Sequence, residues 1–104
     1  MILEVAILNV RAGEASAFER DFADASRYIR SIQGYLNHEL HHCIENPNRY
    51  ILLARWETLE AHTVGFRTSG AYLEWKRLLH HYYDPFPTVE HYRAVDLDIA
   101  GKPV

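Results

Sequence analysis

The chain has 104 residues, of which 48% are hydrophobic and 24% are charged, and its formal net charge at pH 7 is −3. This length fits a single domain, 1–104, and the composition is that of a folded globular protein rather than of a disordered segment. Acidic and basic residues are interspersed, so the sequence offers no basic stripe that could neutralise a phosphate backbone. We therefore expect no nucleic-acid partner.

Cysteine content and apolar runs indicate the compartment. Cys43 is the only cysteine, which excludes a disulfide within the chain and favours a reducing environment. The apolar residues 1–10 include Glu4 and lack the basic segment and cleavage site of a signal peptide. No apolar stretch approaches the ~20 residues of a membrane-spanning helix. The sequence predicts a cytoplasmic protein with no membrane partner.

The first half of the chain predicts one strand and one helix. Residues 2–10 are rich in Ile, Leu and Val and end at Ala12-Gly13, which is typical of a buried strand closed by a turn. Residues 14–32 predict an amphipathic helix that ends at Gln33-Gly34. Its apolar positions recur at helical spacing: Ala15, Phe18, Phe22, Ala25, Ile29 and Ile32.

Further along, the pattern alternates between strands and helices. Residues 35–45 and 50–56 predict a hairpin around the turn at 46–49. Thr58 and Ser69 each precede an apolar helical pattern and are predicted helix caps, the second helix reaching about residue 83. Pro85 and Pro87 end it, residues 88–96 predict a fourth strand, and 97–104 form a loose tail.

The resulting order β-α-β-β-α-β predicts a ferredoxin-like α+β fold, in which both helices lie on one face of a four-stranded antiparallel sheet. This topology places the first and third strands at the centre. These two strands have the fewest charged residues, Glu4 and Arg55. The predicted core spans about residues 2–96.

Both faces of the two central strands are apolar. In residues 2–10, Leu3, Val5 and Ile7 alternate with Ala6 and Leu8, and residues 50–56 repeat the pattern. Two helices cover only one face, so we expect a second copy of the chain to cover the other and to form a homodimer. The alternative is that the short tail folds back over the sheet.

Seven histidines raise the question of a metal site. His38 and His42 share a strand face, but they lie ~13 Å apart, which is too far for shared chelation. His80 and His81 are adjacent on a helix and do not face each other. We therefore expect no metal. His91, on a strand face of mixed polarity, is assigned a structural or interfacial role.

His62 is the titratable group best placed for chemistry. It lies between Leu59 and Phe66 on the apolar side of its predicted helix, where burial would tune its pKa. The alternative is a core histidine bonded to a backbone carbonyl. Tyr72 and Trp75 form an aromatic stripe on the next helix, which is either core or the wall of a pocket.

Four short segments resemble the antibiotic biosynthesis monooxygenase family of dimeric α+β barrels, and the resemblance extends to about Val95. These segments are Gly13-Glu14, Gly34-Tyr35, Arg55-Trp56-Glu57 and Leu59-Glu60-Ala61-His62. The resemblance implies a cofactor-free oxidation of a phenolic, quinol or polyketide-like aromatic by dioxygen. His62 would be the base, with Trp56, Phe66, Tyr72 and Trp75 as substrate-binding residues.

A branch of the same family binds haem through an asparagine in the first strand, a tryptophan after the third strand and a histidine in the next helix. The matching positions here are Ala6, Phe66 and Lys76 or Trp75. The histidine ligand is missing, so we expect no haem and no other cofactor. The remaining alternatives are a binding or structural protein without oxygenase activity, and an isomerase of the same fold.

Overall fold

A computed structural model describes residues 1–100 of the chain. Its elements follow the predicted order, with a short helical turn after α2 and another at the end. Their bounds are β1 Ile2–Asn9, α1 Ala15–Arg30, β2 Tyr35–His42, β3 Arg49–Trp56, η1 Ala61–Phe66, α2 Gly70–Leu79, η2 His80–Tyr82, β4 Val89–Tyr92 and α3 Leu97–Ala100.

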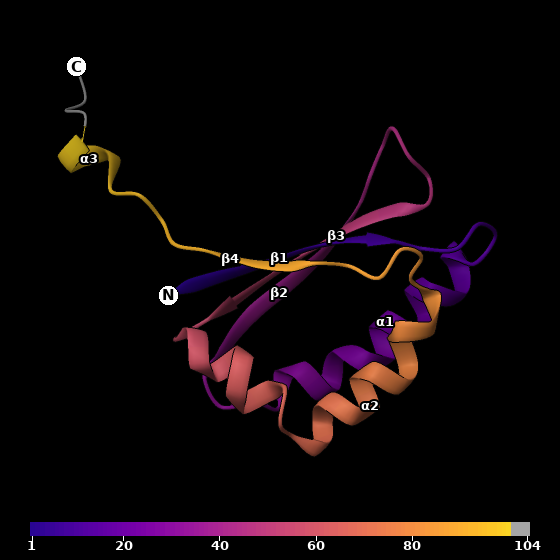
Figure 1. The fold of residues 1–104 in the computed structure, drawn as a ribbon, viewed down its shortest axis with the longest axis horizontal. Helices are drawn as coiled ribbons and strands as arrows, with labels where there is room; N and C mark the ends of the chain where they lie inside the picture. The colour runs from indigo at the N-terminus through magenta and orange to yellow at the C-terminus, as the bar shows by residue number, and fades with distance from the viewer. Residues whose placement is uncertain (101–104) are drawn as a thin grey trace.

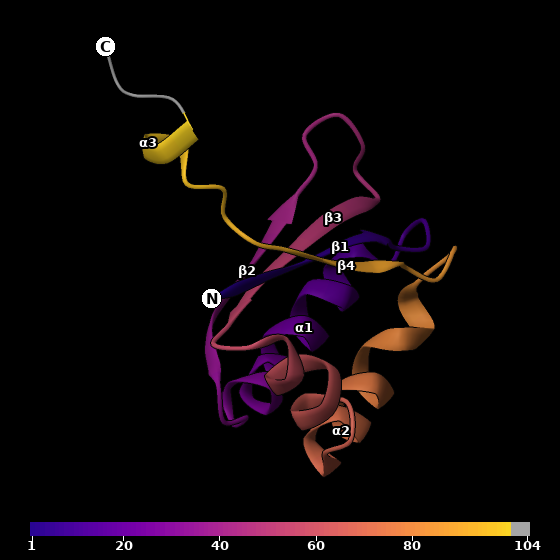
Figure 2. The same ribbon diagram turned by 60° about the vertical axis from the view of Figure 1, so that its left-hand side comes forward.

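Within residues 1–100, four strands form one antiparallel sheet in the order β2-β3-β1-β4. The central pair runs in register from Ile2 opposite Trp56 to Asn9 opposite Arg49. Both α1 and α2 lie on the same face of this sheet, side by side (Figure 1 and Figure 2). The ferredoxin-like α+β prediction is therefore confirmed.

The core lies between the helices and one face of the sheet. Alternation along β1 and β3 turns Ala6, Leu8, Leu52 and Ala54 toward the helices, and each is at most 4% exposed. Helix α1 contributes its apolar stripe of Phe18, Phe22, Ala25 and Ile29. The spacing of apolar residues thus determines which face of each element is buried.

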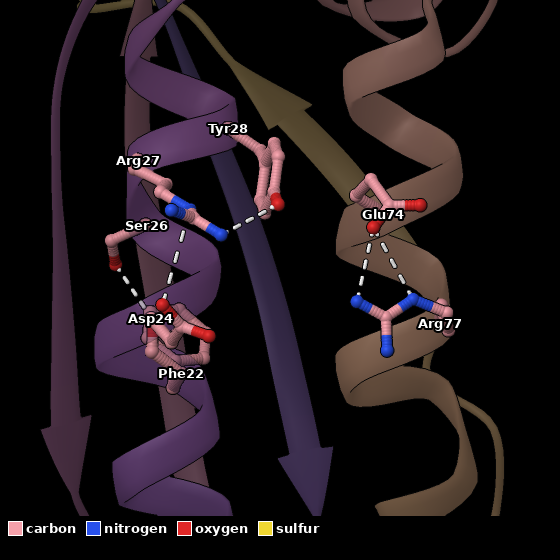
Figure 3. A network of polar contacts seen from close by, with 7 residues as sticks. All are labelled: Phe22, Asp24, Ser26, Arg27, Tyr28, Glu74 and Arg77. Carbon is pink, nitrogen blue, oxygen red and sulfur yellow. Dashed lines mark hydrogen bonds and ion pairs between the residues drawn. The ribbon is translucent and has the colours of Figure 1, made fainter.

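Several polar contacts on the outer surfaces of α1 and α2 join residues of the same helix. Arg77 pairs with Glu74 at 3.0 Å within α2, and Arg27 lies 3.9 Å from Asp24 and donates to Tyr28 within α1 (Figure 3). Exposed pairs of this kind contribute little to stability. These local pairs therefore add little to the packing of the helices against the sheet, which involves the apolar side of each helix and a hydrogen bond from the Tyr50 hydroxyl of β3 to Glu19 of α1.

Three details differ from the sequence prediction. A bulge between Tyr35 and Asn37 interrupts the first strand of the predicted hairpin, turns Tyr35 toward Trp56 and leaves Leu36 42% exposed. The second strand ends at His42, before the predicted residue 45. The fourth strand pairs only with residues 3–6 of β1 and ends at Tyr92 instead of 96.

The segment after β4 leads away from the sheet, and α3 lies apart from it (Figure 1). Residues 101–104 of the predicted tail lie outside the described residues. No helix within residues 1–100 is both long and apolar enough to cross a lipid bilayer.

Candidate active site

A pocket of about 410 Å³ lies between the helix-facing side of the sheet and the helical segment from η1 to η2. Small and aliphatic side chains of the central strands form one wall, and aromatic rings form the opposite one. The lining side chains that matter for chemistry or recognition are Glu4, His62, Phe66, Arg67, Tyr72 and Trp75.

The residues predicted from sequence gather at this pocket. His62, Phe66, Tyr72 and Trp75 line it, and the Phe66 ring makes edge contacts with Tyr72 at 5.2 Å and Trp75 at 5.6 Å between centroids. Trp56 lies behind this wall, fully buried, and stacks on His62 with a centroid distance of 5.2 Å. Trp56 itself does not line the pocket, but it contacts three residues that do, His62, Phe66 and Glu4.

Glu4 is a carboxyl group within the hydrophobic core, with only 5% of the residue exposed. The indole N–H of Trp56 donates to Glu4 Oε1 at 2.9 Å. Burial raises the pKa of Glu4 to about 7, against the opposing effects of the Trp56 hydrogen bond and the charge of Arg67. Near neutral pH this carboxyl group is therefore present in both protonation states.

His62 stands between Glu4 and His91. Its Nδ1 lies 2.8 Å from Nε2 of His91, and its Nε2 lies 3.4 Å from Oε1 of Glu4. Burial, assisted by the charges of Arg67 and His91, lowers the pKa of His62 to about 3. The imidazole is thus neutral at physiological pH, and one of the two histidines donates the proton shared between them.

Local backbone structure explains why His62 points inward. Thr58 caps the segment by accepting a hydrogen bond from the Ala61 N–H, and the Arg67 N–H then reaches back five residues to the His62 carbonyl. This π-helical turn buries both His62 and Phe66. Such turns are rare and often occur at functional sites.

Sheet register brings the other two groups together. Glu4 and His91 are cross-strand partners in β1 and β4, so both side chains emerge on the helix-facing side.

Arg67 lines the pocket from an exposed position, and its charge lowers the pKa of Glu4, His62 and His91. An anion bound in the pocket would benefit from the same positive charge.

Sequence reasoning missed Glu4 and His91 as parts of the site. A signal for Glu4 was available, because strict alternation places it in the same inward series as Ala6 and Leu8. A carboxyl group in such a series must be paired or protonated. No comparable signal marks His91, since its role depends on the β1 and β4 register.

Glu4, His62 and His91 form a chain of pairwise contacts rather than a converging set. Within residues 1–100, no group of three or more His, Cys, Asp or Glu side chains is arranged to hold a metal ion. Carboxyl and imidazole groups in such contact can take part in proton transfer, hydrogen bonding and electrostatic stabilisation.

Comparison with known proteins gives the same fold and one family. The family model for antibiotic biosynthesis monooxygenases matches residues 1–78. The uncharacterized protein YczJ of Bacillus subtilis (strain 168) is 48% identical over 95 residues, which cover 91% of this chain and 100% of that protein.

Two solved structures illustrate the range of similarity. A Bordetella bronchiseptica protein assigned to the antibiotic biosynthesis monooxygenases is 35% identical, with a TM-score of 0.87 over 91% of this chain and 97% of that chain. SnoaB of Streptomyces nogalater, described as a cofactor-independent oxygenase, is 22% identical, with a TM-score of 0.73 over 91% and 93%. The likeness to SnoaB is one of fold.

Proposed function

This chain belongs to the antibiotic biosynthesis monooxygenase family, and we propose that it is a cofactor-independent monooxygenase that oxidises a phenolic, quinol or polyketide-like aromatic compound with dioxygen. The observation that carries the proposal is the aromatic-walled pocket with a buried Glu4 and His62 on its surface. Its volume of about 410 Å³ lies within the range of small-molecule sites. The description of SnoaB as a cofactor-independent oxygenase also supports it.

The proposed reaction begins with removal of a proton from the substrate hydroxyl. The resulting anion is rich enough in electrons to reduce dioxygen itself, so every electron that dioxygen accepts comes from the substrate. One oxygen atom enters the substrate as a carbonyl group, and the other leaves as water. The protein must therefore position the ring, exclude water and accept the proton.

The side chains divide these tasks in the proposal. Phe66, Tyr72 and Trp75 would hold the aromatic ring of the substrate, because they present ring faces and edges to the pocket. Trp56 would support the polar pair from behind. His62, predicted from sequence as the catalytic residue, would act together with Glu4 in taking up the proton.

We also propose that the protein works as a homodimer through the sheet face opposite α1 and α2. Both helices lie on the other face (Figure 2). Leu3, Val5, Ile51 and Leu53 are only partly buried on the open face, and Ile7 is 44% exposed. A second copy would remove this apolar patch from water.

Oxygen uptake with a panel of bulky phenols, quinols and anthrones tests the proposed function. We expect that at least one compound is oxidised, with uptake of dioxygen, when the protein is present. The same compound should remain unchanged when it is incubated with the protein in the absence of dioxygen. Conversion that proceeds equally well without dioxygen would contradict an oxygenase and favour an isomerase.

A further inference from the structure

We propose that Glu4 is the catalytic residue that accepts the substrate proton, and that His62 and His91 are positioning residues that orient its carboxylate. The inference rests on the proposed function and specifies which atom of the site receives the proton.

The contacts of the Glu4 carboxylate leave one oxygen for the substrate. Within residues 1–100, both polar partners of this carboxylate, Trp56 at 2.9 Å and His62 at 3.4 Å, contact Oε1. Glu4 also lines the pocket, so Oε2 keeps its lone pairs for a group bound there. A general base needs this kind of access to the proton it removes.

The two ring nitrogens of His62 are both engaged inside the protein. Nδ1 is bonded to His91, and Nε2 faces Oε1 of Glu4. A substrate hydroxyl could reach either nitrogen only by breaking a contact that the fold has formed. Moreover, a base with a pKa of about 3 holds a proton poorly at neutral pH, whereas Glu4, with a pKa of about 7, is well matched.

His62 and His91 instead set the orientation of Glu4. When Glu4 is ionised, the favoured His62 tautomer has its proton on Nε2, directed at Oε1, and Nδ1 then accepts from Nε2–H of His91. This series of hydrogen bonds from His91 through His62 fixes Oε1 between Trp56 and His62. With Oε1 engaged in these contacts, Oε2 is the carboxylate oxygen left to meet a group bound in the pocket that Glu4 lines.

The proton transfer conserves charge within the site. The O–H bond of the phenol breaks, an O–H bond forms on Oε2 of Glu4, and the electron pair stays on the phenol oxygen as phenolate. The negative charge moves from the carboxylate to the substrate, where Arg67 on the pocket wall stabilises it. The phenolate is then the electron donor for dioxygen.

Proton uptake on binding of 4-nitrophenol tests the inference without turnover. At about pH 8, Glu4 and 4-nitrophenol are both mostly ionised, and two such charges in one buried site force the uptake of a proton. Calorimetry in two buffers of different ionisation enthalpy measures the number of protons taken up per molecule of 4-nitrophenol bound. We expect about one proton for the wild-type protein and close to none for Glu4→Gln, which keeps the oxygen that accepts from Trp56.

Two further variants complete the design. His62→Ala should still take up about one proton, because the acceptor remains. Glu45→Gln is the matched control, since Glu45 is exposed on the loop between β2 and β3 and is not among the residues that line the pocket. It should behave as the wild type.

The outcomes separate this inference from the proposed function. Equal proton uptake in the wild type and Glu4→Gln, or loss of uptake in His62→Ala alone, would overturn the role of Glu4. Failure of 4-nitrophenol to bind the wild type would contradict the phenol site itself and the inference with it. Should Glu4→Gln fail to fold, the wild type alone decides: an infrared carbonyl band of a protonated carboxyl group must appear on binding, and its absence refutes the assignment.

Discussion

Glu4 and His91 oppose each other in the register of β1 and β4, and His62 bonds to His91 while lying 3.4 Å from Glu4. The sheet therefore supplies two of the three groups at a fixed spacing, and η1 inserts the third between them. Because Glu4 lies on a central strand, its carboxyl group cannot withdraw to solvent. Its burial is imposed by the fold, and the raised pKa is the consequence.

The first prediction concerns stability. Between about pH 4.5 and 7 the folded state binds more protons at Glu4 than the unfolded state does, so its contribution to stability falls as pH rises. The Glu4→Gln variant has no titrating group at this position, so its stability does not decrease with pH for this reason. We expect the free energy of unfolding of Glu4→Gln, relative to wild type, to increase from pH 5 to pH 8 by about 2–3 kcal/mol. Urea unfolding at the two pH values measures it, and a pH-independent difference would contradict the raised pKa.

The topology was predictable because its determinants are local. Apolar spacing marked the buried faces of α1, β1 and β3, and low charge identified the central strands. Strand ends were predicted less well, because β4 stops where its partner β1 begins, and a bulge at Leu36 shifts one strand by a residue. Neither the early end of β4 nor the bulge changes the spacing of apolar residues in the sequence, so neither could be predicted from that spacing.

The site was only partly predictable. His62 was found because its helical neighbours are apolar, and Tyr72 and Trp75 because they share a stripe. Glu4 and His91 come from opposite ends of the chain, and only strand register brings them together. Non-local pairing of this kind has no signature in a single sequence.

A second prediction tests the contact between η1 and the loop before β2. A side chain at Gly34 would place its Cβ 2.7 Å from that of Ala61, and the φ angle of +91° disfavours any L-residue. We expect Gly34→Ala to destabilise the protein by about 1–3 kcal/mol. Gly70→Ala is the control, since its Cβ meets nothing within 4 Å and should leave thermal stability unchanged or slightly higher. Equal effects of the two substitutions would refute the close packing.

A third prediction compares two variants in an oxygen-uptake assay with whichever compound of the panel is turned over. Glu4→Gln should lower kcat/KM by roughly 10²–10⁴-fold, the usual contribution of a positioned base. His62→Ala should cost less, up to about 10²-fold, because it disturbs only the orientation of the base. His81→Ala, at an exposed site in η2 that is not among the residues that line the pocket, should leave the rate unchanged. A larger loss in His62→Ala than in Glu4→Gln would return the role of base to His62.

The fourth prediction is the pH dependence of the same reaction. The active form has Glu4 ionised, and the ionised fraction rises with pH through a pKa of about 7. For wild type, kcat/KM should therefore climb through neutral pH and level off above it, since this parameter reports the free enzyme. Glu4→Gln should lose this rise. A wild-type profile that is flat between about pH 6 and 8 would speak against a base with this pKa.

The last prediction concerns the open face of the sheet. Wild-type protein should sediment as a dimer at micromolar concentration, because Ile7 and its neighbours on β1 and β3 otherwise remain in water. Ile7→Glu would bury an unpaired carboxylate in the dimer interface. Because a two-fold symmetric interface contains this residue from both copies, the free-energy cost of burying the charge is incurred twice. We expect this variant to be a folded monomer by sedimentation and circular dichroism. Leu73→Glu adds the same charge at a residue of α2 that is 64% exposed, and it should remain dimeric. If the wild type is monomeric, or if Ile7→Glu still forms dimers, the subunits do not meet through this face.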